Sequence, residues 1–268
     1  MNLENITSRV IEICREVGAF IASERKSFSE SLVKVKGAKV HDLVTHVDLE
    51  SEKRLITSLK GLVPKAGFIT EETNSNYKEG LNWIIDPIDG TTNFVQGVPH
   101  YCISVALVQS KEHLIGVVYD VANNDMYYTW KDAPSYCNEN IISVSKKNKL
   151  RDALIATGFS VKDNSKLNEN LALLKLWIEE TRGIRRLGSA ALDLCYVASG
   201  VFDVYYETNL SAWDVGAGAL IVKNAGGSVS DFIGGNQYLY GNEILATNGE
   251  IHQLVITKMN EKLKGALE

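Results

Sequence analysis

Apolar residues recur at helical spacing in two stretches near the start of the chain. In residues 3–30, charged residues separate the apolar ones, which predicts an amphipathic helix. A second helix is predicted over residues 47–63 and ends before Pro64, because proline disfavours the helical conformation of the residue before it. Between them, residues 27–42 mix Ser, Gly and Lys with no sustained period, so we expect a loop or an irregular hairpin.

Short apolar runs typical of strands dominate the rest of the first half. They are GFIT, NWII, YCISVALV, HLIGVVYD and MYYTW, between residues 67 and 130. Residues 123–125, Asn-Asn-Asp, lie between the last two runs and are typical of a hairpin turn.

The second half alternates between helical stretches and strand-like runs. Strands are predicted at ALIAT, FDVYYE and EILAT, and helices over 168–182, 189–199, 214–225 and 251–264. Gly200 and Gly226-Gly227 are expected to stop two of these helices. The two patterns together predict two sheets covered by helices, with a boundary near residue 145 between an N-terminal α+β half, residues 1–145, and a C-terminal α/β half, residues 146–268.

Composition narrows the class of protein. The 268 residues are 45% hydrophobic and 23% charged, as in soluble globular proteins. The start shows no secretory signal, and no apolar run approaches the roughly 18 residues of a membrane span. Cys14, Cys102, Cys137 and Cys195 are far apart among apolar neighbours, so we expect small buried side chains in a reducing compartment. These features predict a soluble, cytoplasmic protein with no membrane partner.

Net charge argues weakly against a nucleic-acid partner. The chain has 28 Lys and Arg against 33 Asp and Glu, which gives a charge of −5 and no basic stripe. An anionic substrate would therefore need a cation between itself and the protein.

The segment WIIDPIDGTTNFVQG carries the most informative chemistry. Asp86 and Asp89 follow an apolar strand, and a surface turn would need neither carboxylate. A calcium loop of the EF-hand type fails because its third and twelfth positions would be Ile88 and Gly97. A covalent aspartyl-phosphate site of the DxDGT type fails because its nucleophile position is Pro87. The pair therefore indicates metal ligands.

Further acidic residues occur at two other places. Glu71 and Glu72 end another short apolar run, and Asp214 begins a predicted amphipathic helix. Taken alone, the glutamates fit a solvated loop better than a site, and a helix cap explains Asp214 equally well.

Taken in order, these segments resemble the inositol monophosphatase family of metal-dependent, lithium-sensitive sugar phosphatases. The matching strings are HDLVTHVD, TEE, DPIDGTTNF, YCISVAL, RRLGSAALDLCYVASGVFDVYYE and WDVGAGALIVKNAGG, which span nearly the whole chain. Three positions depart from the family pattern: Thr70 and Asn224 replace a glycine and a glutamate, and Glu139 replaces the glycine of an Asn-Gly turn. These departures alter turns and surrounding groups and leave the ligand set intact.

The resemblance implies a fold and a metal site. The fold is the layered αβαβα sandwich of the inositol monophosphatase and fructose-1,6-bisphosphatase type, commonly a homodimer. Glu71, Asp86 and the Ile88 carbonyl would hold one ion, and Asp86, Asp89 and Asp214 a second, about 3.5–4 Å away. Because all these donors are hard oxygens, Mg²⁺ or Mn²⁺ is expected in two or more copies.

The resemblance also implies catalytic and substrate-binding residues. Thr91 and Glu71 would orient and deprotonate the attacking water, and Asp48 would accept a hydrogen bond from the Thr91 hydroxyl, unless it is only a helix-start carboxylate. The backbone N–H groups of Gly90 and Thr91 would cradle the phosphate. The substrate contacts would come from Ile88, Asp89, Gly90, Thr91, Gly188, Ser189, Ala190, Glu207 and Asp214.

Three assignments at the rim of the site stay open. Ser189 equally suits a helix N-cap. Lys34, Lys36 and Lys39 suit either a flap over the substrate or a solvated loop. Arg185 and Arg186 suit a solvated or interface position better than contact with a second phosphate.

The expected function is a Mg²⁺-dependent phosphomonoesterase that acts on myo-inositol 1-phosphate or a similar small polyol or sugar phosphate and is inhibited by lithium. Alternative substrates are fructose 1,6-bisphosphate, NADP(H) and histidinol phosphate, since related enzymes share the metal core and differ at the rim. An alternative of another class is a regulatory protein that binds RNA or the transcription machinery.

Overall fold

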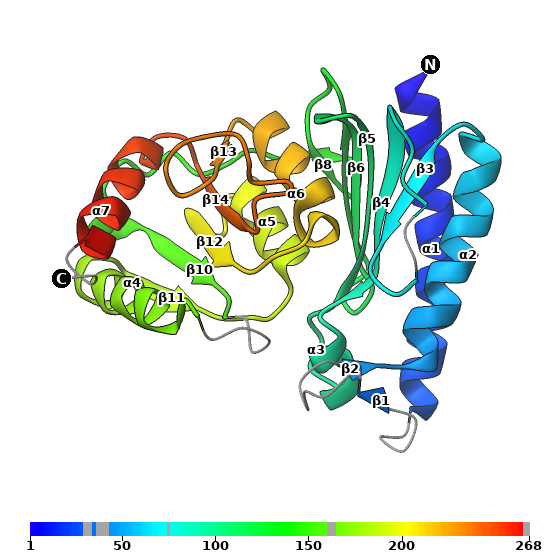
Figure 1. Cartoon of the computed structure of the whole chain (residues 1–268), viewed down its shortest axis with the longest axis horizontal. Coiled ribbons are helices and arrows are strands. Elements are labelled where there is room, and N and C mark those ends of the chain that lie inside the picture. The colour runs from blue at the N-terminus through cyan, green and yellow to red at the C-terminus, as the bar shows by residue number, and fades with distance from the viewer. Residues whose placement is uncertain (29–33, 36–42, 74–75, 160–164, 265–268) are drawn as a thin grey trace.

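The computed structural model describes residues 1–28, 34–35, 43–73, 76–159 and 165–264, and these form five stacked layers (Figure 1). Helices α1 (Leu3–Ser27) and α2 (His46–Leu62) cover the outer face of a seven-stranded sheet. Helices α5 (Ala190–Ala198) and α6 (Ala212–Asn224) fill the space between this sheet and a five-stranded one. Helices α4 (Leu167–Glu180) and α7 (His252–Lys264) form the last layer. The predicted αβαβα sandwich is confirmed.

The larger sheet follows the chain from one edge to the other. Its strands are β3 (Gly67–Thr70), β4 (Leu81–Asp89), β5 (Cys102–Gln109), β6 (Glu112–Asp120), β7 (Asp125–Trp130), β8 (Tyr136–Cys137) and β9 (Asn140–Ile141), in that order. Only the β3–β4 pair is parallel among these strands. The hairpin expected at residues 123–125 joins β6 to β7.

In the smaller sheet, the order of the strands differs from their order along the chain. Its strands run β11 (Gly183–Arg185), β10 (Leu154–Thr157), β12 (Val204–Thr208), β14 (Glu243–Thr247) and β13 (Ser228–Ser230). Strand β10 is parallel to both of its neighbours, and β14 is antiparallel to β12 and β13. A short pair, β1 (Lys34–Val35) and β2 (Leu43–Val44), and the short helices α3 (Thr91–Gln96) and η2 (Leu150–Asp152) complete the described elements.

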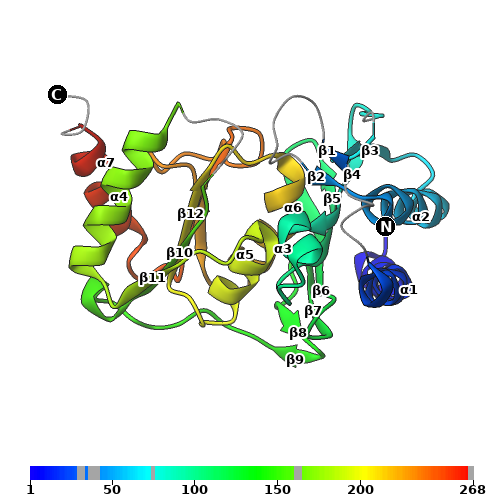
Figure 2. The same cartoon turned by 90° about the horizontal axis from the view of Figure 1, so that it is seen from below.

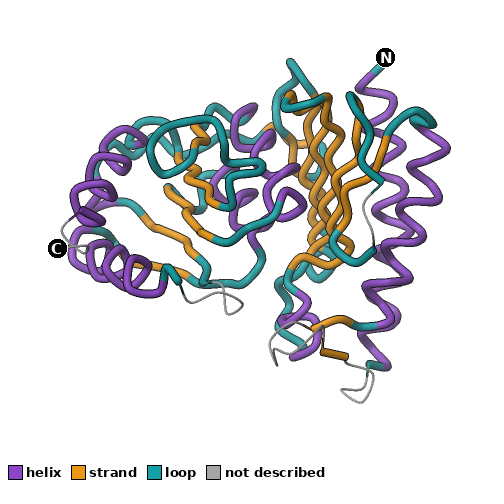
Figure 3. Tube along the Cα trace, in the orientation of Figure 1, coloured by secondary structure: helices purple, strands orange, loops and turns teal. Residues whose placement is uncertain are grey.

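Helix α6 differs from its prediction. The sequence predicts an amphipathic helix, whereas nearly all of α6 after Asp214 is buried, from Val215 to Val222. The cause is its position between the two sheets, where β4, β5 and β6 contact one side and β14 the other (Figures 2 and 3). A helix that meets sheets on two sides needs no polar face.

The predicted helix stops and the predicted state of the cysteines agree with the structure. Gly200 and Gly226 follow α5 and α6 with φ of 74° and 92°, the left-handed conformation that ends helices. All four cysteines are free thiols, and three of them are buried, with Cys137 half-buried. Residue 145, near which the boundary is predicted, lies between β9 and β10, and the division into two parts stays a prediction. No described helix is long and apolar enough to cross a membrane.

Candidate active site

A bulge at the end of β4 brings Asp86 and Asp89 to the same side of the sheet. Opposite them on β5 lie Ser104 and Cys102, so β4 advances three residues where β5 advances two. Residues three apart on a regular strand point to opposite faces, and the extra residue cancels this alternation. Pro87 is tolerated because a bulge releases its position from the ladder. The sequence predicted that the strand ends before Asp86, whereas β4 continues to Asp89.

Asp214 reaches the same place from the start of α6. Its carboxylate accepts the Ser211 N–H at 2.6 Å in a capping box, and Ser104 Oγ donates to the Trp213 carbonyl at 3.1 Å, which ties this helix end to β5. Carboxylate oxygens of Asp86, Asp89 and Asp214 all lie within 4.8 Å of one another. The helix-cap explanation of Asp214 and its place in an acidic cluster are therefore both correct.

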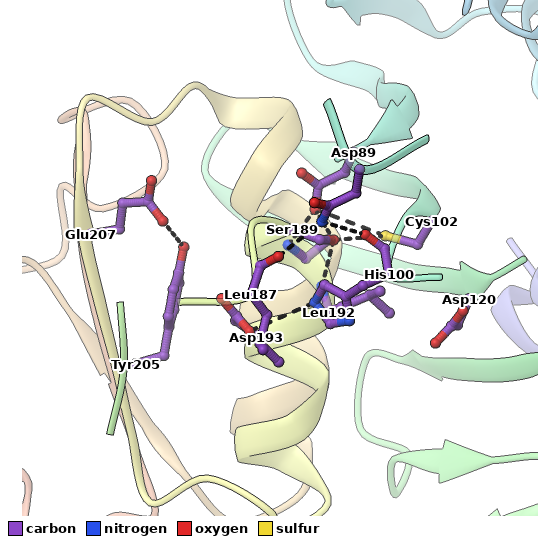
Figure 4. A network of polar contacts seen from close by, with 12 residues as sticks. Asp89, His100, Cys102, Asp120, Leu187, Ser189, Leu192, Asp193, Tyr205 and Glu207 are labelled. Atoms are coloured by element: carbon purple, nitrogen blue, oxygen red, sulfur yellow. Dashed lines mark hydrogen bonds and ion pairs between the residues drawn. The ribbon is translucent and has the colours of Figure 1, made fainter. Parts of the chain in front are cut away.

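The Asp89 side chain is fixed by the start of α5 (Figure 4). Its Oδ2 accepts hydrogen bonds from Ser189 Oγ and from the Ala191 N–H, each at 2.7 Å. Ser189 also accepts the Leu192 N–H at 3.4 Å, so it is the N-cap of α5 as well. The segment from Ser189 to Leu192 thus starts α5 and also orients the carboxylate of Asp89, which comes from the N-terminal half of the chain.

Electrostatics in this cluster favour a bound cation. Burial raises the pKa of Asp86 well above its usual range, and the charges of Glu71, Asp89 and Asp214 raise it further. The pKa of Asp214 is raised by burial and then by Asp89 and Glu71. Like charges crowded in a desolvated site need a cation to stay ionised. Because the donors are all hard oxygens, the residues present fit a divalent ion such as Mg²⁺.

Glu71 lies in the loop that follows β3, near the carboxylate cluster. Both Glu71 and Glu72 are half-buried, which does not fit a solvated loop. Glu52, fully buried in α2, accepts the Glu72 N–H at 2.8 Å and the Thr73 hydroxyl at 2.6 Å. The three-carboxylate cluster does not include Glu71, but its charge acts on two of the members.

Thr91 and Asp48 form the hydrogen bond expected from the sequence. Thr91 Oγ1 lies 3.2 Å from Asp48 Oδ1 and 3.1 Å from the Ile88 carbonyl oxygen, which share its proton. The other oxygen of Asp48 accepts the backbone N–H and the hydroxyl of Thr45, at 2.9 and 2.5 Å. Asp48 therefore caps α2 and holds Thr91 at once.

A left-handed glycine starts α3 beside this pair. Gly90 has a φ of 96°, and a Cβ there would lie 3.0 Å from the His100 carbonyl and 3.3 Å from the Gly188 carbonyl. Asn93 Nδ2 donates to the carbonyls of His100 and Leu187, both at 2.8 Å. The segment that carries Gly188, Ser189 and Ala190 is thereby tied to α3.

Glu207 lies on β12, half-buried on the side of α5. Its Oε2 accepts the Tyr205 hydroxyl at 2.7 Å, and burial raises its pKa to about 7. Arg185 and Arg186 are exposed. The side chains of Lys34, Lys36 and Lys39 lie outside the described residues, as does the flap assigned to them.

Sequence reasoning missed four residues that hold this site together. Thr45 precedes a predicted helix and fits an N-cap, so the signal was present. The others give no signal, because their role depends on contacts between distant segments: Glu52, Asn93 and Ser104.

The fold and the acidic cluster define a class, the metal-dependent phosphatases of the inositol monophosphatase superfamily. The model of the inositol monophosphatase family matches residues 2–264, and the chain belongs to this family. It is 38% identical to the Nus factor SuhB of Haemophilus influenzae over 253 residues, 93% of either chain.

Two solved structures agree with this assignment. The extragenic suppressor protein SuhB of Bartonella henselae is 31% identical with a TM-score of 0.90, over 96% of this chain and 99% of that one. An IMPase of Thermotoga maritima is 32% identical with a TM-score of 0.86, over 96% and 97%.

Proposed function

We propose that the protein is a Mg²⁺-dependent phosphomonoesterase that hydrolyses myo-inositol 1-phosphate or a similar small polyol phosphate to the alcohol and inorganic phosphate. The observation that carries this proposal is the convergence of Asp86, Asp89 and Asp214 within 4.8 Å at the junction of β4 and α6. The ions would be held by the side chains of Glu71, Asp86, Asp89 and Asp214 and by the Ile88 carbonyl. When bound, Mg²⁺ supplies a Lewis acid that activates water and neutralises phosphoryl charge.

The chain's own groups then orient the attack. Because the Thr91 hydroxyl donates its proton to Asp48 or to the Ile88 carbonyl, its lone pairs are available to accept a hydrogen bond from the attacking water. Glu71 would take the proton that this water loses. The backbone N–H groups of Gly90 and Thr91 would hold the phosphate, and Gly90 permits a close approach.

The alcohol part of the substrate would lie toward α5 and β12. Glu207 would accept a hydrogen bond from a hydroxyl, and Gly188, Ser189 and Ala190 would line the near side. Such a site favours a hydroxylated alcohol, because an alcohol without that hydroxyl would make one hydrogen bond fewer to the half-buried carboxylate of Glu207.

A panel of phosphate esters tests the substrate class. With Mg²⁺ present, we expect myo-inositol 1-phosphate to be hydrolysed with a higher kcat/KM than fructose 1,6-bisphosphate, NADP⁺ and histidinol phosphate, and millimolar lithium to inhibit. A kcat/KM for inositol phosphate far below any of the others would assign that other substrate. Sedimentation of the same protein tests the homodimer that we also propose.

A regulatory role is the second candidate, and the name Nus factor carried by the Haemophilus relative favours it. In this proposal the protein associates with RNA or the transcription machinery in addition to, or instead of, hydrolysis. Asp89→Asn separates the two roles, because it removes a proposed metal ligand on the inside of the fold. A cellular role that survives the loss of hydrolysis would support the regulatory candidate.

A further inference from the structure

The carboxylate of Glu207 occupies the space that a side chain at residue 158 would need. A Cβ placed on Gly158 would lie 1.9 Å from Glu207 Oε2 and 2.1 Å from its Cδ. Gly158 is not among the residues with positive φ, so its backbone conformation suits any residue. The glycine is therefore required by the carboxylate beside it and by no turn.

Strand register explains why these two residues meet. Strands β10 and β12 are parallel, with Ala156 beside Tyr205 and Thr157 beside Tyr206, so Gly158 follows at the level of Glu207. Side chains alternate along both strands, which puts residues 156 and 158 on the same face as residues 205 and 207. Ala156 and Tyr205 are indeed buried together in the core between the sheets.

Tyr205 binds the same carboxylate oxygen that lies nearest to Gly158. This tyrosine is fully buried, and its hydroxyl donates to Glu207 Oε2 at 2.7 Å (Figure 4). The Glu207 carboxylate is thus in contact with both a rigid phenol and a bare backbone. Neither neighbour can shift readily, because Tyr205 is packed in the core and Gly158 directly follows a paired strand.

We propose that Gly158 is a positioning residue that fixes the depth of the Glu207 carboxylate and thereby the affinity for the hydroxylated part of the substrate. This inference rests on the proposed role of Glu207. Any side chain at residue 158 would push the carboxylate out of its place or would rotate it away from Tyr205. The phosphate half of the site, built on β4, α3 and α6, would not change.

The Gly158→Ala variant tests this on the Mg²⁺-loaded enzyme. We expect KM for myo-inositol 1-phosphate to rise about tenfold to a hundredfold, the range for loss of one hydrogen bond to a charged group, with a smaller change in kcat. The inhibition constant of inorganic phosphate should stay unchanged, because phosphate does not need Glu207. Gly61→Ala is the matched control, since a Cβ on Gly61 has nothing within 4 Å.

A second variant distinguishes displacement of the Glu207 carboxylate from a general packing defect. Glu207→Asp shortens the side chain by one methylene and withdraws the carboxylate from residue 158. We expect Gly158→Ala to add little to KM in the Glu207→Asp background, whereas independent effects would add fully. If Gly158→Ala alone is insoluble, a soluble double variant with the KM of Glu207→Asp supports the proposal, and an insoluble one contradicts it.

The outcomes separate this proposal from the function on which it rests. A Gly158→Ala enzyme with unchanged KM, beside a Glu207→Gln enzyme with raised KM, overturns the positioning role alone. An equal loss of affinity for inositol phosphate and inorganic phosphate also overturns it. If Glu207→Gln leaves KM unchanged, the hydroxyl-binding role itself is wrong, and a wild type without hydrolysis contradicts the proposed function.

Discussion

Single side chains in this site serve two purposes, one structural and one chemical. Asp48 caps α2 and accepts a hydrogen bond from Thr91. Ser189 caps α5 and donates to Asp89, and Asp214 closes a capping box while it joins the acidic cluster. For these residues the structural and functional interpretations of the sequence were not alternatives. Their catalytic roles remain predictions.

Replacing Thr91 tests the orientation of the attacking water. Thr91→Ala should lower kcat about a hundredfold, at the low end of the range for a positioned proton-transfer group, and should leave Mg²⁺ affinity nearly unchanged. Thr91→Ser keeps the hydroxyl and is the matched control, expected within a few fold of wild type. Steady-state kinetics and calorimetric Mg²⁺ titration measure both. An unchanged kcat in Thr91→Ala would remove Thr91 from the mechanism.

The buried His113 is expected to make the free energy of unfolding depend on pH. Its Nδ1 lies 2.8 Å from the Gly216 carbonyl, its Nε2 lies 3.2 Å from the Tyr238 hydroxyl, and Lys223 donates to that hydroxyl. Burial lowers the pKa of His113 to about 4, against 6.5 for an ordinary histidine. The unfolded chain therefore binds more protons between these values, so stability is full above pH 6.5 and falls as pH drops toward 4.

The measurement is urea unfolding between pH 5 and 7.5, with His113→Phe as the comparison. As pH falls from 6.5 to 5, wild type should lose on the order of 1 kcal/mol per pH unit more than the variant, and above pH 6.5 the two curves should be parallel. Carboxylates with raised pKa act in the opposite sense in both proteins and cancel in the difference. Curves for the two proteins that stay parallel down to pH 5 would show that His113 is not held neutral.

At the scale of elements, length decided what the sequence could predict. Periodic or apolar segments of five or more residues, such as α1, α2, β5 and β14, agree with their predictions within a few residues. Strands β8, β9, β11 and β13 have two or three residues each and show no period that a sequence reading could detect. The bulge in β4 was missed because it depends on pairing with β5, which is not visible in either strand alone.

One departure from the family pattern strains a turn. Asn138 and Glu139 connect β8 to β9 with φ of 48° and 71°, and the left-handed conformation disfavours a glutamate more than the usual glycine. Glu139→Gly should therefore stabilise the protein by about 1 kcal/mol, measured by denaturant unfolding, whereas Glu139→Gln should not. A destabilised glycine variant would contradict this account of the turn.

Another departure has a local explanation. Asn224, in place of the family's glutamate, donates through Nδ2 to the Trp130 carbonyl at 3.0 Å and to Thr129 Oγ1 at 2.8 Å. A carboxylate could not donate there. The change connects the end of α6 to β7 and leaves the carboxylate cluster untouched.

At the scale of the whole molecule, the site belongs to both halves of the chain. Asp86 and Asp89 come from the larger sheet, and Asp214 and the start of α5 come from the segments around the smaller one. The sequence predicted this meeting only through the family resemblance, because periodicity and spacing do not show which distant segments converge. The resemblance and the layered fold are confirmed, and the boundary near residue 145 stays a prediction.

Because Asp86, Asp89 and Asp214 lie close together, we expect the thermal stability of the protein to depend on Mg²⁺. Without Mg²⁺, Asp89→Asn should unfold at a higher temperature than wild type, because it removes one of the charges that repel Asp86 and Asp214. The hydrogen bonds that Asp89 accepts from Ser189, Ala191 and Cys102 end on one oxygen, which an asparagine carbonyl can replace. Each 1 kcal/mol gained shifts the midpoint by about 2–4 °C. With Mg²⁺ the order should reverse, and a calorimetric scan showing no reversal would contradict a metal site here.

The central claim is that this acidic cluster binds Mg²⁺ and hydrolyses a phosphate ester. The most direct test measures phosphate release from myo-inositol 1-phosphate by chelator-treated protein as Mg²⁺ is added back, for wild type and Asp89→Asn side by side. We predict no release without metal, recovery with Mg²⁺ in wild type, and a rate reduced at least a hundredfold in Asp89→Asn. Release that persists after chelation, or an Asp89→Asn rate equal to wild type, would contradict the claim.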